Sequence, residues 1–165
     1  GMGAHRWVQK AAFYEESVRV PLIFSSPFLP RQSMKDHTSL ASLIDIFPTF
    51  CDFAGIAPPP GLRGSSLKPA IETGKPLART FAVSEQGKFG APDREGRMLR
   101  TLTHKYVAYN GGDRPEQLFD LVHDPGETRN LALAEPASPL LKQCRAQLAA
   151  WARQHNDQFC STHWT

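Results

Sequence analysis

Long hydrophobic runs are missing from this sequence. No stretch of its 165 residues approaches the roughly 18 consecutive apolar residues that a membrane-spanning helix needs, so we expect no membrane partner. No signal peptide is recognisable either, because the first residues lead straight into polar sequence. The sequence therefore leaves the localisation open.

Clustered positive charge is also absent. The net charge is only +3, and lysines and arginines are scattered among acidic residues rather than gathered in a block. A nucleic-acid-binding surface normally shows a basic stripe, often with interleaved aromatic residues. We therefore expect no nucleic-acid partner.

Cysteine is scarce, and its spacing excludes the usual cysteine chemistry. The three cysteines, Cys51, Cys144 and Cys160, form neither a CxxC pair nor a zinc-ligand pattern. Cys51 and Cys144 fall on the apolar faces of predicted helices, where a free cysteine behaves as a small hydrophobic residue. We predict that both are packing residues.

The first half of the chain predicts one strand and one helix. Residues 18–25, VRVPLIFS, are β-rich and continuously apolar in their second half, which predicts a strand buried on both faces. Residues 38–55 predict a helix with apolar positions Leu40, Leu43, Phe47 and Phe50 on one face. Thr38 or Ser39 is expected to cap its start, Pro48 to kink or restart it near Asp45, and Gly55 to end it. A short helical turn is predicted near Leu67–Ile71.

The second half predicts an antiparallel sheet with a helix. Four short β-rich runs, at residues 80–86, 96–103, 105–110 and 116–122, are separated by turn signals and indicate a meander. Ser138–Pro139 is a typical helix start, and Leu141, Cys144, Leu148 and Trp151 form an apolar stripe after it. The predicted fold class is α/β to α+β, with one part over 1–75 and a second over 76–165.

Three stretches together resemble the C-terminal portion of a sulfatase of the alkaline-phosphatase superfamily. They are GAHRWVQKAAFYEESVRVPLI, SLIDIFPTFCDFAGIAPPPGLRGSSL and RMLRTLTHKYVAYNGGDRPEQLFDLVHDPGETRNLA, which occur in the family's order and cover residues 3 to about 155. The resemblance implies that residues 1–75 are the incomplete end of the catalytic α/β domain, with a strand and a helix of its large sheet. It also implies that residues 76–165 are a C-terminal subdomain of four antiparallel strands and a helix.

The family's catalytic machinery is not found in this sequence. Sulfatases hydrolyse sulfate esters with a formylglycine made within a Cys/Ser-x-Pro-x-Arg motif and with a divalent cation, usually calcium. None of the three cysteines begins such a motif, and the family's paired aspartates are missing. We therefore expect no metal ligands or cofactor in this chain, which would be inactive alone. Calcium and formylglycine are expected only in a full-length family member.

The resemblance points to few site residues. Lys10 matches the family lysine that contacts the sulfate group, where an ammonium offsets the charge that develops on ester cleavage. At about 4 Å and an effective dielectric near 20, such a pair is worth roughly 4 kcal/mol before desolvation. An ordinary exposed loop lysine is the alternative. His5 and His104 are substrate-binding candidates, with loop packing for His5 and a solvated turn for His104 as alternatives.

Several acidic residues in the matched stretches are interpreted as structural. Glu15 and Glu16 are expected to bind loop amides or to pair with Arg19. Asp120, Asp124, Glu127 and Asn130 do not have the spacing of an EF-hand calcium loop and are interpreted as turn and capping residues.

Other functions stay open at this point. The chain would instead be a non-catalytic module that covers exposed apolar surface by forming a homo-oligomer. A fragment of a related phosphatase or phosphonate hydrolase is a further alternative, because the lysine segment alone does not separate sulfate from phosphate chemistry. If the protein is a sulfatase, its substrate is a sulfate ester that the sequence does not name.

Overall fold

Residues 3–6, 12–29, 36, 38–87 and 95–161 are described by the computed structural model of the chain. They form two compact units. The helical unit is Pro21–Ala82, and the sheet unit combines Gly1–Val20 with Val83–Thr165. Within the described ranges, no helix has the length and apolar character that crossing a membrane requires.

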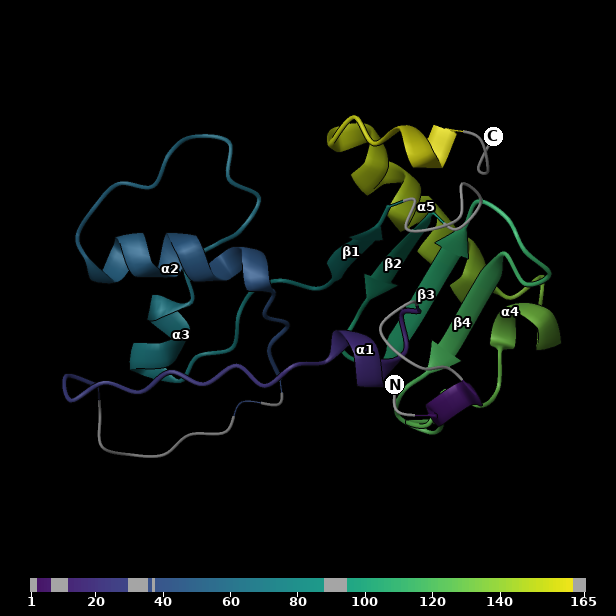
Figure 1. Ribbon diagram of the computed structural model, residues 1–165, viewed down its shortest axis with the longest axis horizontal. Coiled ribbons are helices and arrows are strands. Elements are labelled where there is room, and N and C mark those ends of the chain that lie inside the picture. Colours follow the sequence, from purple (N-terminus) through teal and green to yellow (C-terminus); the bar gives the residue numbers. More distant parts are fainter. Residues whose placement is uncertain (1–2, 7–11, 30–35, 37, 88–94, 162–165) are drawn as a thin grey trace. The chain divides into compact units, whose positions relative to one another are not determined.

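The sheet unit is built on four strands. These are β1 (Ala82–Gln86), β2 (Gly96–Arg100), β3 (His104–Tyr109) and β4 (Glu116–Asp120), arranged in the order β1-β2-β3-β4 (Figure 1). β3 pairs antiparallel with both β2 and β4. The predicted four-stranded meander is thus confirmed; β1, β2 and β4 lie inside their predicted runs, and β3 starts one residue before its run, at His104.

One face of the sheet lies against the C-terminal helix. The register places Leu99, Tyr106 and Leu118 side by side on this face, and α5 (Pro139–Gln154) runs across it (Figure 1). Leu141 and Leu148 of α5 are fully buried. The Ser138 hydroxyl accepts a hydrogen bond from the Leu141 amide, which confirms the predicted cap. Two short elements complete the unit, α4 (Leu131–Ala134) and η3 (Gln158–Ser161).

The opposite face of the sheet is covered by the N-terminal segment, which contains η1 (Ala4–Arg6) and α1 (Glu15–Val18). Phe13 packs there in a cluster with Met98 and Val107. Gly96 allows this close approach, because a Cβ at this position would lie 2.8–2.9 Å from the rings of Tyr109 and Phe13. The chain therefore joins residues near its start to strands about a hundred positions later.

The strand expected over residues 18–25 is wrong. Val18 ends α1, and residues 19–26 form no strand. A strand buried on both faces needs hydrogen-bonding neighbours, and no described segment pairs with these residues. The compact units also differ from the predicted division at residue 75, because the segment that contains Phe13 packs on the sheet. The assignment of residues 1–75 to a catalytic domain stays a prediction.

The helical unit contains η2 (Leu43–Asp45), α2 (Ile46–Phe53) and α3 (Lys68–Thr73). The predicted start at Thr38 or Ser39 is wrong, because Ser42 caps η2 through a capping box with Asp45. The restart near Asp45 is confirmed. Pro48 lies in the first turn of α2, where its missing N–H breaks no helical hydrogen bond. Gly55 follows the helix with φ 67°, as a helix-ending glycine should.

The apolar stripe of this helix does not form a core in the chain as described. Leu40 and Cys51 are buried, but Leu43, Phe47 and Phe50 are 61%, 52% and 60% exposed. The buried residues of α2 are instead Pro48, Thr49 and Cys51. Helix α2 therefore buries small side chains and exposes its large aromatic ones.

Candidate functional site

Lys105 is the most deeply buried cation of the described residues. It lies on the face of the sheet that the N-terminal segment covers, and its side chain has no exposed surface. Its Nζ is 2.7 Å from Glu127 Oε1 and 2.8 Å from Glu15 Oε1, and it donates a 2.8 Å hydrogen bond to the Phe13 carbonyl oxygen. This one ammonium joins the N-terminal segment, β3 and the turn after β4.

Glu127 completes the cluster. Its Oε2 accepts a 2.6 Å hydrogen bond from the Glu15 amide, and its backbone adopts φ 51°. Burial opposes ionisation of Glu15, but Lys105 and Arg100 outweigh it and lower the pKa of that carboxyl. Every charge in the cluster faces an opposite charge, so the cluster locks the fold and offers no free acid or base.

These contacts change the interpretation of two residues. Glu15 pairs with Lys105 and Arg100 instead of the expected Arg19. Glu127 was expected to act as a turn residue, yet it is a buried partner of Lys105. Lys105 itself was not singled out from the sequence, although the matched K-Y dipeptide contains it. The signal in the sequence was a lysine within a predicted strand that is otherwise apolar, which indicates a buried lysine with acidic partners.

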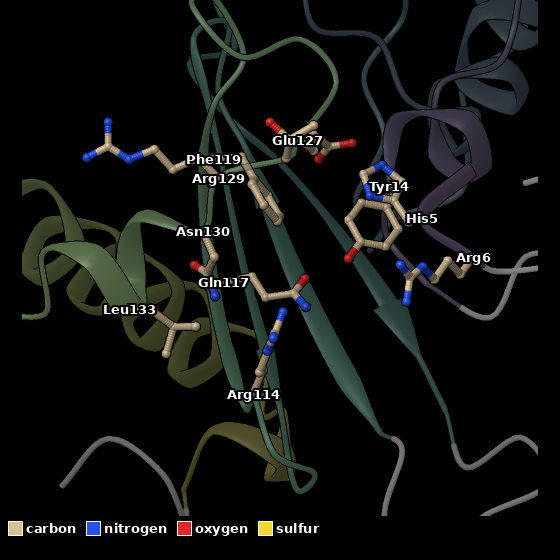
Figure 2. A pocket seen from close by; sticks show the side chains of 11 residues that line it. His5, Arg6, Tyr14, Arg114, Gln117, Phe119, Glu127, Arg129, Asn130 and Leu133 are labelled. Atoms are coloured by element: carbon tan, nitrogen blue, oxygen red, sulfur yellow. The ribbon is translucent and has the colours of Figure 1, made fainter. Parts of the chain in front are cut away.

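A cavity of about 490 Å³ opens beside this cluster in the sheet unit (Figure 2). Its wall combines the N-terminal segment with β4 and the turn that follows β4. The lining residues are His5, Arg6, Tyr14, Arg114, Gln117, Phe119, Glu127, Thr128, Arg129, Asn130 and Leu133.

Aromatic rings form one side of this cavity. The imidazole of His5 stacks on the ring of Tyr14, with centroids 3.6 Å apart and an interplanar angle of 2°. Tyr14 also contacts Phe119, whose ring is tilted at a centroid distance of 6.0 Å. Burial and the nearby Glu127 carboxylate raise the pKa of Tyr14, so its hydroxyl stays protonated and available as a donor.

The structure separates the two histidines named from the sequence. His5 lines the cavity, whereas His104 starts β3 opposite Asp120 and points its Nδ1 at the Thr103 hydroxyl, 2.8 Å away. Because side chains alternate along β4, Gln117 and Phe119 of the cavity lie on the other face from Asp120 and its partner His104. Lys10 lies outside the described residues. The substrate roles of all three stay predictions.

One group of described residues has ligand atoms close enough together to suggest a metal ion. His5, Glu16 and Glu127 place one such atom each within 4.8 Å of the others. The Glu127 carboxylate, however, already contacts the Lys105 ammonium and the Glu15 amide. A calcium ion at this point would face a buried lysine and lacks the six to eight oxygen ligands that it prefers. This group of three residues therefore does not fit a calcium site.

The turn after β4 is stabilised by its own side chains, as predicted. Asp124 accepts hydrogen bonds from the amides of Thr128 and Arg129, and Asp120 from those of Val122 and His123. The Asn130 side chain accepts from the amides of Leu118 and Ala132 and donates to the Glu116 carbonyl oxygen. The Asn130 side chain thus forms three hydrogen bonds within the fold.

A second polar network holds the helical unit together. Asp45 is completely buried and binds both terminal nitrogens of Arg79, at 2.5 and 2.6 Å. It also accepts hydrogen bonds from the amides of Ser42 and Ser65. Burial opposes ionisation of Asp45, but the hydrogen bonds from Arg79, Ser65 and Ser42 outweigh it and lower the pKa of the carboxyl.

The same network fixes the loop that follows α2. Thr49 donates to the Asp45 carbonyl oxygen and accepts from the Leu67 amide, and Ser66 donates to Asp52. Gly64 crosses so close to η2 that a Cβ there would lie 2.0 Å from the Ile44 carbonyl oxygen. These contacts hold the loop of residues 64–67 against η2 and α2.

Comparison with known proteins identifies the protein family to which the chain belongs. The family described as N-sulphoglucosamine sulphohydrolase, C-terminal, matches residues 3–154. The chain belongs to this sulfatase family, and the fold class predicted from the sequence agrees with it.

Individual proteins similar to this chain are also sulfatases by name. A Delta 4,5-hexuronate-2-O-sulfatase of Bacteroides thetaiotaomicron is 36% identical over an alignment of 165 residues that covers 98% of this chain and 34% of that protein. Arylsulfatase K of Mus musculus is 38% identical over an alignment of 140 residues that covers 80% of this chain and 25% of that protein. The solved structure of a 2-O GAG sulfatase covers 100% of this chain and 36% of its own, with a TM-score of 0.87 and 34% identity. The chain thus spans about a third of the longest-matching relatives.

Proposed function

We propose that this chain is the C-terminal portion of a sulfuric ester hydrolase and that it is inactive by itself. The observation that carries the proposal is the ratio of coverages: 98% of this chain matches 34% of a sulfatase. In this proposal the formylglycine nucleophile and the calcium ligands belong to the other two-thirds of a longer polypeptide. The described residues supply neither.

Lys10 is the residue that this chain contributes to the reaction. It occupies the family position of the lysine that contacts sulfate, five residues after His5. A fixed ammonium there stabilises the negative charge that builds on the leaving oxygen as the S–O bond breaks. Removing one such electrostatic contact typically costs about 10²–10³ in kcat.

Helix α2 supplies a second argument for a longer polypeptide. The exposed side chains of Leu43 in η2 and of Phe47 and Phe50 in α2 follow one another at helical spacing. Contiguous apolar surface of this kind marks an interaction site. We infer that the catalytic remainder of the sulfatase covers this face, because the relatives carry this segment within much longer chains.

The test is sulfate release by the longest open reading frame that contains this sequence. We expect the longer protein to release sulfate from a 2-O-sulfated unsaturated hexuronate disaccharide, Lys10→Ala to lower kcat by about 10²–10³, and the 165-residue chain to release none. Arg153→Ala, on the exposed end of α5, is the matched control and should keep full activity. Turnover by the 165-residue chain alone would contradict the proposal. Preference for a phosphate or phosphonate ester would favour the related hydrolases instead.

The exposed face of α2 also supports a second candidate, a non-catalytic module that forms a homo-oligomer. In that case a second copy of the chain covers Phe47 and Phe50. Size-exclusion chromatography with light scattering separates the two: a stable dimer that Phe50→Ser dissociates supports the module, and a monomer supports the sulfatase portion.

A further inference from the structure

The cavity of the sheet unit has an unbalanced positive charge. Arg6 and Arg114 both line it, and neither forms an ion pair with the carboxylate of another described residue. Arg129 is different, because it approaches Glu135 at 3.6 Å and extends away from the Tyr14 ring in Figure 2. The one carboxylate in the wall, Glu127, is neutralised by Lys105. Two guanidinium groups are therefore left to face an anion.

The backbone of this wall is held in an uncommon conformation. Among described residues other than glycine, positive φ occurs at His5 (54°), Arg6 (61°), Glu127 (51°) and Asn156 (53°). The first three line the cavity. Such conformations are sparsely populated by L-residues and gather at sites where geometry serves a function. Here they fix the directions of the His5 and Arg6 side chains.

The remaining wall offers both a flat surface and hydrogen-bonding groups. The stacked rings of His5 and Tyr14 form one side, and Figure 2 shows Arg114 and Gln117 directed toward the Tyr14 hydroxyl from the opposite side. Asn130 contributes nothing to a ligand, because its side chain is engaged within the fold. A cavity of about 490 Å³ falls in the size range of small-molecule sites, about 300–1,000 Å³.

We propose that this cavity binds an acidic sugar, with a carboxylate or sulfate group of the sugar held between Arg6 and Arg114 and the sugar ring against the His5–Tyr14 pair. Guanidinium groups bind planar or tetrahedral oxyanions through paired hydrogen bonds. The choice of a sugar rests on the proposed function, and the anion requirement rests on the two arginines alone. The cavity thus sets the substrate class by its charge.

The experiment titrates the 165-residue chain and follows backbone amides and arginine Nε–H groups by NMR. The probes are a 2-O-sulfated unsaturated hexuronate disaccharide, the same disaccharide without sulfate, its carboxyl-reduced and unsulfated form, and sodium sulfate. The variants are Arg114→Gln and Arg6→Gln, with Arg153→Gln as the matched control on α5. Unchanged signals from β2 and β3 show that each variant is folded.

The proposal expects saturable shifts at Arg6, Tyr14, Arg114 and Gln117 with either acidic disaccharide, at least tenfold weaker binding by each cavity variant, and binding within twofold of wild type for Arg153→Gln. Comparison of the two acidic disaccharides identifies whether sulfate or carboxylate is the group bound. Equal affinity for the carboxyl-reduced, unsulfated sugar or for sodium sulfate would overturn it, as would equal loss in Arg153→Gln or no shift at these residues. The titration measures binding and not hydrolysis. If the longer protein releases no sulfate, the binding result still stands. If the cavity binds no acidic sugar, the sulfate-release result still stands.

Discussion

The two compact units differ in what they bury. In the sheet unit, Leu99, Leu141 and Leu148 are completely buried between the sheet and α5. In the helical unit, the completely buried side chains are Asp45 and Thr49, while Phe47 and Phe50 are more than half exposed. The interior of the sheet unit is largely apolar, whereas the helical unit buries a polar network beside a few apolar residues and leaves its phenylalanines exposed.

This difference indicates how each unit is stabilised. Burial of apolar surface is the main favourable contribution to folding, so the sheet unit has what it needs to be stable by itself. A buried ion pair fixes a particular arrangement but adds little net stability. We therefore expect the helical unit to be specified by Asp45 and Arg79 and to need a covering surface for the rest of its stability.

The largest effect is expected when the charge balance of the sheet unit is broken. Lys105→Met leaves the carboxylates of Glu15 and Glu127 without their shared cation, and we expect the free energy of unfolding to fall by about 3–5 kcal/mol. Urea unfolding followed by circular dichroism measures the loss. Lys142→Met, on an exposed position of α5, should change stability by less than about 0.5 kcal/mol. A Lys105→Met protein as stable as the control would show that the cluster is dispensable.

A matched pair of truncations compares the two kinds of apolar residue. Leu148→Ala empties a fully buried site and should cost about 2–5 kcal/mol. Phe50→Ala removes a larger side chain, yet it should cost less than about 0.5 kcal/mol in the 165-residue chain because that ring is mostly exposed. In the longer polypeptide, Phe50→Ala should cost about 3–5 kcal/mol. Equal costs of Phe50→Ala in the two proteins would contradict the proposed covering surface.

A smaller effect is expected from the polar network of the helical unit. Asp45→Asn removes the charge that faces Arg79 and should weaken the unit by about 1.5–3 kcal/mol. Hydrogen exchange at the amides of Ser65 and Leu67 reports this locally, because these amides bind Asp45 and Thr49. Glu72→Gln, exposed on α3, is the control. Unchanged hydrogen exchange at these amides in Asp45→Asn would contradict a stabilising role of the polar network.

The smallest effect is expected from pH, because the free energy of unfolding should fall in acid. The folded pKa values of Asp45 and Glu15 lie below their ordinary values of 3.8 and 4.5. Each carboxylate therefore contributes stability that is fully present above its ordinary pKa and is lost as the pH falls through the lower folded value. Unfolding free energies between pH 6 and pH 3 should decline, and Asp45→Asn should flatten the decline for the helical unit alone. An unchanged decline in that variant would contradict the role of Asp45.

The sequence was sufficient for features that depend on neighbouring residues. The four strands follow from short β-rich runs between turn signals, and the start of α5 follows from Ser138–Pro139. These patterns act over a few positions, so no tertiary information is needed. The capping of the turn by Asp120, Asp124 and Asn130 was predictable for the same reason.

Contacts across the chain were not predictable in this way. Glu15 and Glu127 are 112 positions apart, and only the fold shows that Lys105 lies between them. The strand predicted at Val18–Ser25 failed because a strand needs a neighbouring strand, which local sequence does not provide. For the candidate site, the matched stretches indicated His5, which lines the cavity. They also indicated His104, which lies on the other face of the sheet. Arg6 and Arg114 belong to no recognised motif, and only their position in the cavity wall identified them as candidate binding residues.

We expect the helical unit to depend on a covering surface and the sheet unit to be stable without one. Hydrogen exchange by mass spectrometry, compared between the 165-residue chain and the longest open reading frame that contains it, tests this directly. We expect amides of β2, β3 and β4 to be protected equally in both proteins, and amides of α2 to be strongly protected only in the longer one. Equal protection of α2 in the two proteins would contradict the claim.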